Sequence, residues 1–185
     1  MSIPRVITCA KCTLAIPGPA EAGAVASYFD RNRAHLEPWE PERPPGFYTK
    51  RFWESRLDAN AEEALRESHA RYFMLREGVA MSERVVGTCN FSNIVRGAFR
   101  ACHLGYGLDA KLVGQGYMYD ALSHALPTIM DALDLHRVMA NYMPENARSA
   151  KVLQRCGFVI EGFAESYLHI GGRWRDHILT SFVRA

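Results

Sequence analysis

Apolar residues recur at every third or fourth position in several stretches of this chain, which is the spacing of an amphipathic helix. The clearest stretch is residues 117–135, where we expect Pro127 to bend the helix because it removes one backbone donor. The pattern predicts four helices in all, over residues 20–32, 49–68, 117–135 and 146–155, the last ended by Gly157.

Shorter apolar runs, rich in β-branched and aromatic residues and bounded by Gly, Pro and charged turns, have the pattern of strands. They alternate with the expected helices, and no repeat or low-complexity linker divides the chain. That order predicts an α/β fold with one mixed sheet, and we expect a single domain over residues 1–185. The expected strands are residues 9–16, 71–76, 85–95, 101–109, 137–143, 158–167 and 174–183.

Composition narrows the class of protein. A net charge of +2, from 22 Lys+Arg against 20 Asp+Glu, gives no reason to expect nucleic acid or an anionic membrane as a partner. The first residues are too short an apolar run for a signal sequence or a membrane span, so we expect a cytoplasmic protein. Five scattered cysteines indicate reduced thiols. Cys9 and Cys12 form one close pair, but on a strand their spacing would put the thiols on opposite faces, so we expect no metal site.

Two glycines, Gly114 and Gly116, lie where a strand meets the longest helix. Glycine lets the backbone adopt a positive φ and approach a ligand closely, while the first N–H groups of the helix have no intrahelical partner. Such a junction binds phosphate groups, although a simple turn would show the same pair of glycines.

The motifs on the C-terminal side of this turn are more specific. Lys111-x-x-Gly114-x-Gly116 is succeeded by a helix and a strand, then by Asn146-x-x-Ser149 and by Gly157-Phe158. This order resembles the GNAT family of N-acetyltransferases, whose hallmark is Q/R-x-x-G-x-G/A followed by N-x-x-[AS] and G-F. Longer segments look like the ribosomal-protein-alanine N-acetyltransferases of the RimJ type. These segments are residues 36–41, 90–93, 96–97, 104–106, 139–144 and 172–177.

The resemblance implies a GNAT fold: a mostly antiparallel mixed sheet of about seven strands and about four helices, splayed between the strands that end at Asp109 and Met143. Acetyl-CoA would lie in the split as cosubstrate, with no metal. Lys111 and Leu112 depart from the residues usual there, and we expect weaker packing around the cofactor but no lost backbone donor. The implied cofactor contacts are Leu108, Asp109, Lys111, Leu112, Val113, Gly114, Gln115, Gly116, Tyr117 and Asn146.

Acetyl transfer to an amine needs a neutral amine and a proton for the departing thiolate. Many family members supply the proton from a tyrosine where this chain has Leu153. The resemblance indicates Ser149 as the replacement, with an ordinary helix-start hydroxyl as the alternative. For the base it indicates His103, with Glu40 as rival and a half-buried structural histidine as the alternative.

The absence of a strong base favours an α-amine acceptor, because an α-amine has a pKa of about 7.7–8.0 whereas a lysine amine has one of about 10.4. Residues 36–42 form a proline-rich segment that we expect to lack regular structure, with Glu37, Glu40 and Glu42 able to attract a basic peptide. Trp39 either fills the core or contacts substrate. The expected substrate contacts are Leu36, Trp39, Glu40, Tyr106 and Asn141.

We therefore expect acetyl transfer from acetyl-CoA to the N-terminal α-amine, that of Ala, of a small-subunit ribosomal protein, by direct attack on the thioester. Association with ribosomal particles would fit that acceptor. A small-molecule or antibiotic acetyltransferase, and a non-catalytic acyl-CoA-binding or ribosome-assembly module, remain alternatives. No sequence pattern indicates the oligomeric state.

Overall fold

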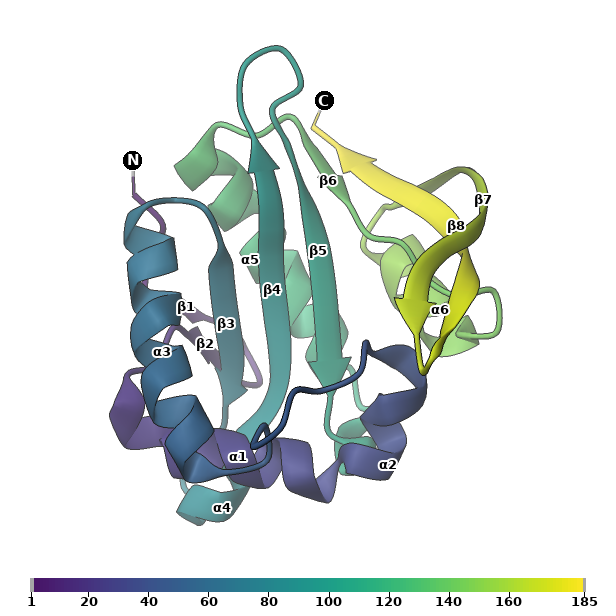
Figure 1. Cartoon of the computed structure of the whole chain (residues 1–185). Helices are drawn as coiled ribbons and strands as arrows, with labels where there is room; N and C mark the ends of the chain where they lie inside the picture. Colours follow the sequence, from purple (N-terminus) through teal and green to yellow (C-terminus); the bar gives the residue numbers. More distant parts are fainter. Residues whose placement is uncertain (1, 185) are drawn as a thin grey trace.

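The computed structural model describes residues 2–184. They contain one continuous eight-stranded sheet with helices on both of its faces (Figure 1). The strand order is β1-β2-β3-β4-β5-β6-β8-β7, and among these described strands only β5 and β6 run parallel. The predicted mixed, mostly antiparallel sheet is confirmed, with eight strands in place of about seven. The strands are β1 (Val6–Thr8), β2 (Thr13–Ala15), β3 (Ala70–Leu75), β4 (Val85–Val95), β5 (Ala101–Leu108), β6 (Arg137–Met139), β7 (Val159–Ile170) and β8 (Arg173–Val183).

Six α-helices within residues 2–184 cover the sheet, and the four longer ones match the four predicted from periodicity. The sequence pattern did not indicate α2 and α4, because each has a single turn and too few residues to show a period. The helices are α1 (Ala22–Arg31), α2 (Arg33–Leu36), α3 (Lys50–Leu65), α4 (Met81–Arg84), α5 (Tyr117–Leu133) and α6 (Ala147–Arg155).

The core has two parts, one on each face of the sheet. The larger cluster packs under α5 and α6, and the apolar stripe of α5 is buried as its spacing predicts. The smaller cluster lies under α1 and α3, where Phe29 stacks on Trp53 with ring centroids 5.0 Å apart. Burying these apolar faces is the main stabilisation of such a sheet. No helix within residues 2–184 is both long and apolar enough to cross a membrane.

The sheet opens between β5 and β6 (Figure 1). The two strands pair over Ala101–His103 and Arg137–Met139. Beyond His103, β5 continues to Leu108 and stays paired with β4. The chain after Met139 follows β8 instead, and Tyr142 forms an antiparallel bridge with Ile178 of that strand. The predicted splay between these two strands is confirmed.

Two local predictions are wrong. Residues 9–16 are not one strand: the chain forms a hairpin, β1 and β2, whose turn is closed by a 3.0 Å hydrogen bond from Cys9 N–H to the Cys12 carbonyl. The segment 36–42 has regular structure at its start, because α2 runs into a 3₁₀ turn over Glu37–Trp39. Pro38 fits there since the first turn of a helix needs no donor from it.

Candidate active site

The turn between β5 and α5 has the backbone geometry of an anion site. After a 3₁₀ turn over Ala110–Leu112, both Gly114 and Gly116 have φ of 80°, a conformation that favours glycine. The first helical bond is the 3.0 Å bond from Asp120 N–H to the Gly116 carbonyl. Within residues 2–184, the N–H groups of 114 and 116–119 have no hydrogen-bond partner. We call residues 112–117 the donor turn.

Side chains around the donor turn divide into exposed and buried ones. Lys111 and Gln115 are exposed, and Gln115 Nε2 donates a 2.8 Å bond to the Lys111 carbonyl. Leu112 belongs to the larger core cluster, and Leu108 and Tyr117 pack against it. The backbone of the turn is therefore what faces outward for a ligand.

Asp109, a predicted cofactor contact, is held by three hydrogen bonds within the chain. Its carboxylate accepts bonds from Arg31 Nε (2.8 Å), Asn32 Nδ2 (3.1 Å) and the Lys111 N–H (3.0 Å), and the residue is buried. Burial alone would raise the pKa of this carboxyl, but these three hydrogen bonds and the Arg31 charge lower it below its ordinary value. Asp109 joins the end of α1 to the start of the donor turn, and its contact with the cofactor stays a prediction.

Two hydroxyls meet across the opening of the sheet. Tyr106 Oη, from β5, lies 2.7 Å from Ser149 Oγ, in the first turn of α6. Asn146 caps that helix, because its Oδ1 accepts the Ser149 N–H at 3.1 Å. Its Nδ2 has no partner within residues 2–184. Burial raises the pKa of Tyr106 well above its usual range, so the phenol keeps its proton at neutral pH.

Leu153, at the position where the family resemblance implies a tyrosine, is 1% exposed in the core and offers no proton. The candidate proton donors are therefore the hydroxyls of Tyr106 and Ser149, and sequence reasoning missed that the two form a pair. Only the folding of α6 back onto β5 shows it.

His103 lies on the other face of β5 from Tyr106, since strand positions three apart point to opposite sides. It is half-buried opposite Ser92 of β4, and its Nδ1 has no hydrogen-bond partner in the described chain. Burial lowers the pKa of His103, so the ring is neutral at pH 7 and able to accept a proton. The structure does not bring it into contact with Ser149.

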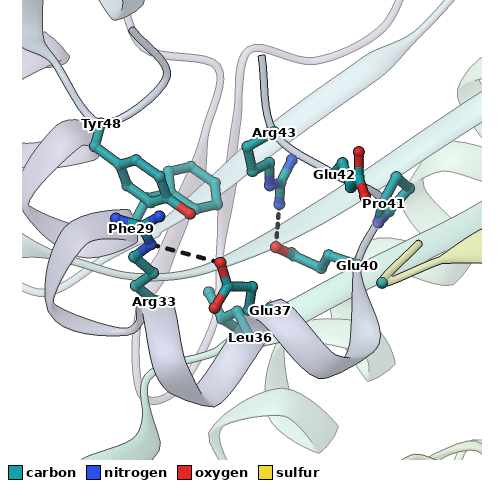
Figure 2. Close-up of a pocket in the computed structure, with 10 residues that line it drawn as sticks. Phe29, Arg33, Leu36, Glu37, Glu40, Pro41, Glu42, Arg43 and Tyr48 are labelled. Carbon is teal, nitrogen blue, oxygen red and sulfur yellow. Dashed lines mark hydrogen bonds and ion pairs between the residues drawn. The ribbon is translucent and has the colours of Figure 1, made fainter. Parts of the chain in front are cut away.

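The predicted acceptor segment forms a pocket of about 340 Å³ (Figure 2). Four of its five charged groups, all but Glu42, are paired: Arg43 binds Glu40, and Arg33 Nε lies 3.5 Å from Glu37 Oε1. Gly171, from the turn between β7 and β8, closes one side. We call this the acceptor pocket; its lining residues are Phe29, Arg33, Leu36, Glu37, Glu40, Pro41, Glu42, Arg43, Tyr48 and Gly171.

The predicted substrate residues Trp39, Leu36 and Asn141 differ in their exposure and in their contacts. Trp39 is 38% exposed, so the interpretation in which it fills the core is wrong, but it does not line the acceptor pocket. Leu36 is buried and lines the pocket floor. Asn141 is occupied: its Oδ1 accepts the Thr180 N–H at 3.1 Å and its Nδ2 donates to Tyr167 Oη at 3.1 Å, which ties β8 and β7 together.

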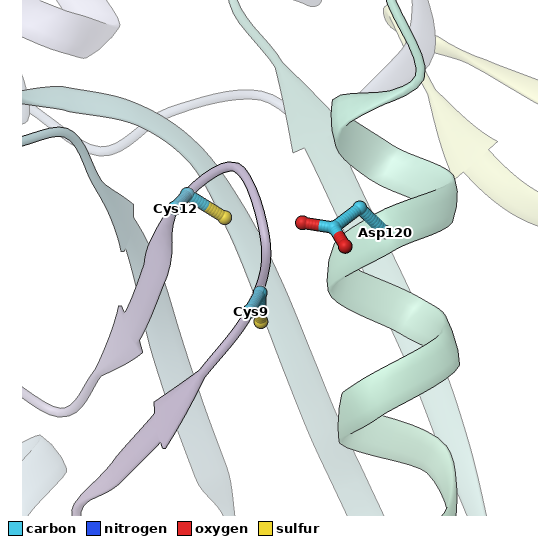
Figure 3. Close-up of side chains that lie close together, drawn as sticks. All are labelled: Cys9, Cys12 and Asp120. Atoms are coloured by element: carbon cyan, nitrogen blue, oxygen red, sulfur yellow. The ribbon is translucent and has the colours of Figure 1, made fainter.

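Cys9 and Cys12 do not face opposite sides as expected. They occupy the hairpin turn, and their sulfurs lie with a carboxylate oxygen of Asp120 in a group whose atoms are all within 4.8 Å (Figure 3). The alternation of faces that holds along a strand does not hold in a turn. The expected absence of a metal site stays a prediction.

Comparisons with known proteins agree with this geometry. The acetyltransferase (GNAT) domain model matches residues 13–159. The ribosomal protein uS5-alanine N-acetyltransferase of Escherichia coli (strain K12) is 39% identical over 183 residues, which are 98% of this chain and 93% of that protein.

Solved structures resemble the whole chain as well. A ribosomal-protein-S5-alanine acetyltransferase from Vibrio fischeri is 38% identical, with a TM-score of 0.89 over 96% of each chain. RimJ of Mycobacterium smegmatis, in complex with CoA-disulfide, is 28% identical, with a TM-score of 0.88 over 97% of this chain and 88% of that one. This chain belongs to the GNAT acetyltransferase family.

Proposed function

We propose that this protein transfers the acetyl group of acetyl-CoA to the N-terminal α-amine of a small-subunit ribosomal protein that begins with alanine. The observation that carries the acceptor is the 39% identity, over 98% of the chain, to the enzyme that acts on alanine of uS5. We propose further that the chain works as one domain in the cytoplasm. One sheet running through all eight strands supports the single domain.

The residues present fit acetyl-CoA. The free N–H groups at the start of α5 suit a pyrophosphate, because aligned backbone donors and the helix dipole favour negative charge. The separation of β5 from β6 after His103 leaves backbone groups of both strands for a pantetheine arm. Asn146 Nδ2, which has no partner within residues 2–184, would donate to the cofactor. When bound, acetyl-CoA supplies the activated acyl group.

Two proton transfers then fall to side chains of this protein: one proton is donated to the departing sulfur, and one is accepted from the attacking amine. As the amine nitrogen forms a bond to the acyl carbon, the carbon–sulfur bond breaks and the thiolate leaves. We assign the Tyr106–Ser149 pair as the donor of a proton to the sulfur; the raised pKa of Tyr106 keeps its hydroxyl protonated, and Ser149 Oγ lies 2.7 Å from that hydroxyl.

The amine side requires an acceptor for the second proton. His103 is neutral and its Nδ1 is free, so it accepts the proton from the attacking amine directly or through water. Glu40 is the rival, but Arg43 already binds its carboxylate. An α-amine with a pKa of about 8 is partly neutral at pH 7, which suits a base of this modest strength.

The acceptor pocket suits the first residues of a peptide. Glu42 is exposed at its edge, and an ideal Cβ on Gly172 would lie 3.4 Å from Glu42 Oε1, so the segment after α2 lies beside the β7–β8 turn at this edge. Unpaired negative charge at the rim favours approach of a cationic amine.

The test is acetylation of two synthetic peptides with the N-terminal sequence of uS5, one free and one with its N-terminus blocked but its lysines intact. Mass spectrometry should show one acetyl group on the free peptide and none on the blocked one. Transfer to polyamines or aminoglycosides with neither peptide modified would reject the acceptor. CoA binding without transfer to any amine would favour a binding module.

A further inference from the structure

Lys11 is distant from the donor turn in sequence but adjacent to it in space. It lies at the tip of the β1–β2 hairpin, and its Nζ is 5.4 Å from the centroid of the Tyr117 ring. An ideal Cβ on Gly116 would lie 3.7 Å from Lys11 Cε. The ammonium group therefore lies beside the free N–H groups at the start of α5.

Asp120 fixes this arrangement. It is buried in the first turn of α5, and its Oδ2 accepts the Lys11 N–H at 2.8 Å while its Oδ1 accepts the Ala10 N–H at 3.2 Å. Figure 3 shows the carboxylate pointing at the hairpin turn between Cys9 and Cys12. Since both oxygens bind backbone amides of the turn, we interpret Asp120 as the anchor that holds the hairpin tip against the helix.

The Lys11 ammonium group lacks an anionic partner. Among residues 2–184 it forms no salt bridge, and its side chain, which is exposed, lies over the Tyr117 ring. The Asp120 charge is turned towards the backbone N–H groups of the hairpin. A cation next to several unpaired backbone donors adds to their preference for an anion.

We propose that Lys11 binds the diphosphate of CoA together with the backbone N–H groups of the donor turn, and that Asp120 is the residue that positions it. This inference rests on the proposed function, because it takes CoA as the ligand of the turn. The β1–β2 hairpin is then part of the cofactor site as well as the edge of the sheet.

The experiment measures CoA affinity by titration calorimetry for the wild type, Lys11→Met, Lys11→Arg and the control Lys151→Met, an exposed lysine of α6. We expect Lys11→Met to weaken CoA binding about tenfold at low salt, because a charge-assisted hydrogen bond to phosphate is lost. The loss should shrink as salt rises. Lys11→Arg should bind within about threefold of the wild type, since it keeps the charge, and Lys151→Met should bind like the wild type.

A second donor separates binding of the diphosphate from damage to the fold. Acetyl-pantetheine has the thioester but no diphosphate, so Lys11→Met and the wild type should use it with equal kcat/KM. Equal CoA affinity of Lys11→Met and the wild type would overturn the inference, and so would an equal loss with acetyl-pantetheine. A wild type that binds no CoA would instead reject the proposed function.

Asp120→Ala tests the positioning step. If Asp120 acts through Lys11, Asp120→Ala weakens CoA binding, and adding Lys11→Met to it causes little further loss. Independent, additive losses in the double variant would overturn the positioning role. Lys11→Met remains decisive for the cofactor contact if Asp120→Ala fails to fold.

Discussion

The donor turn and the acceptor pocket are built in different ways. The donor turn is one contiguous segment whose binding groups are backbone N–H groups, held outward by Gly114 and Gly116. The acceptor pocket draws side chains from α1, α2 and the segment after α2, with Gly171 of the β7–β8 turn at one side, and four of its five charges, all but Glu42, are paired with one another. A backbone site tolerates many side chains, so we expect the donor turn to bind the ligand that family members share. A side-chain site can vary, so we expect acceptor choice to reside in the acceptor pocket.

The largest expected effect is the loss of kcat when the hydroxyls of Tyr106 and Ser149 are removed. Tyr106→Phe combined with Ser149→Ala should lower kcat about a hundredfold or more, because no general acid remains for the thiolate, and leave CoA affinity almost unchanged. Stopped-flow thiol release and calorimetry would measure the two quantities. The control is Tyr72→Phe, which removes another buried hydroxyl, bonded to the Pro4 carbonyl, from β3. Full activity of the double variant would contradict the assignment.

The next effect concerns the base. His103→Gln should lower kcat/KM about ten- to fiftyfold at pH 8. Because burial lowers the pKa of His103 below its ordinary value of 6.5, the contribution of the neutral ring is complete above pH 6.5 and is lost as the pH falls through that lowered pKa. The ratio of wild-type to variant kcat/KM should therefore be constant at high pH and approach one in acid.

The amine titrates alike in both enzymes, so it cancels from this ratio. His136→Gln, which replaces an exposed histidine, serves as the control and should match the wild type at every pH. A ratio that does not change with pH would make His103 a structural residue and return Glu40 to consideration.

A matched pair of glycines tests the donor turn. Gly114 and Gly97 have φ of 80° and 74°, and a Cβ on either would meet no heavy atom within 4 Å. Alanine at either position should therefore cost a similar, about 1 kcal/mol, loss of unfolding free energy. Only Gly114→Ala should weaken CoA binding, by about tenfold, because the strained turn misdirects its N–H groups. Equal CoA affinity of the two variants would show that the donor turn does not bind the cofactor.

The smallest expected effect is a change in KM for the peptide when Glu42, at the rim of the acceptor pocket, is replaced. Glu42→Gln should raise KM about threefold for an alanine-starting basic peptide, with kcat unchanged, because an exposed charge at a rim contributes little. The increase should fade at high salt. Glu62→Gln, on the exposed face of α3, is the control. A larger effect from Glu62→Gln than from Glu42→Gln would move the peptide path away from this pocket.

The four longer helices and the donor turn were predictable because their signals are local. The stripe of α5, the Asn146 cap and the paired glycines are each readable within one short window. Sequence-based prediction was wrong where contacts between distant residues determine the local structure. The apolar run at residues 9–16 has the pattern of one strand, yet the chain reverses there because Asp120 of α5 binds the amides of Ala10 and Lys11.

Site residues show the same division. Ser149 was identified from its motif, but its contact with Tyr106 was not, because no spacing relates residues 43 positions apart. Asp109 and Asn141 stand at motif positions, and only the folded chain shows that Arg31, Thr180 and Tyr167 already occupy their polar atoms.

The sequence by itself therefore determined the order of the main elements, the glycine turn before α5 and the family, since these depend on neighbouring residues and on motifs. Only the tertiary structure decided which side chains meet: the hydroxyl pair, the acceptor pocket and the approach of Lys11 to the start of α5. Their positions depend on packing of the two core clusters against the sheet, and no local pattern in the chain encodes those distances.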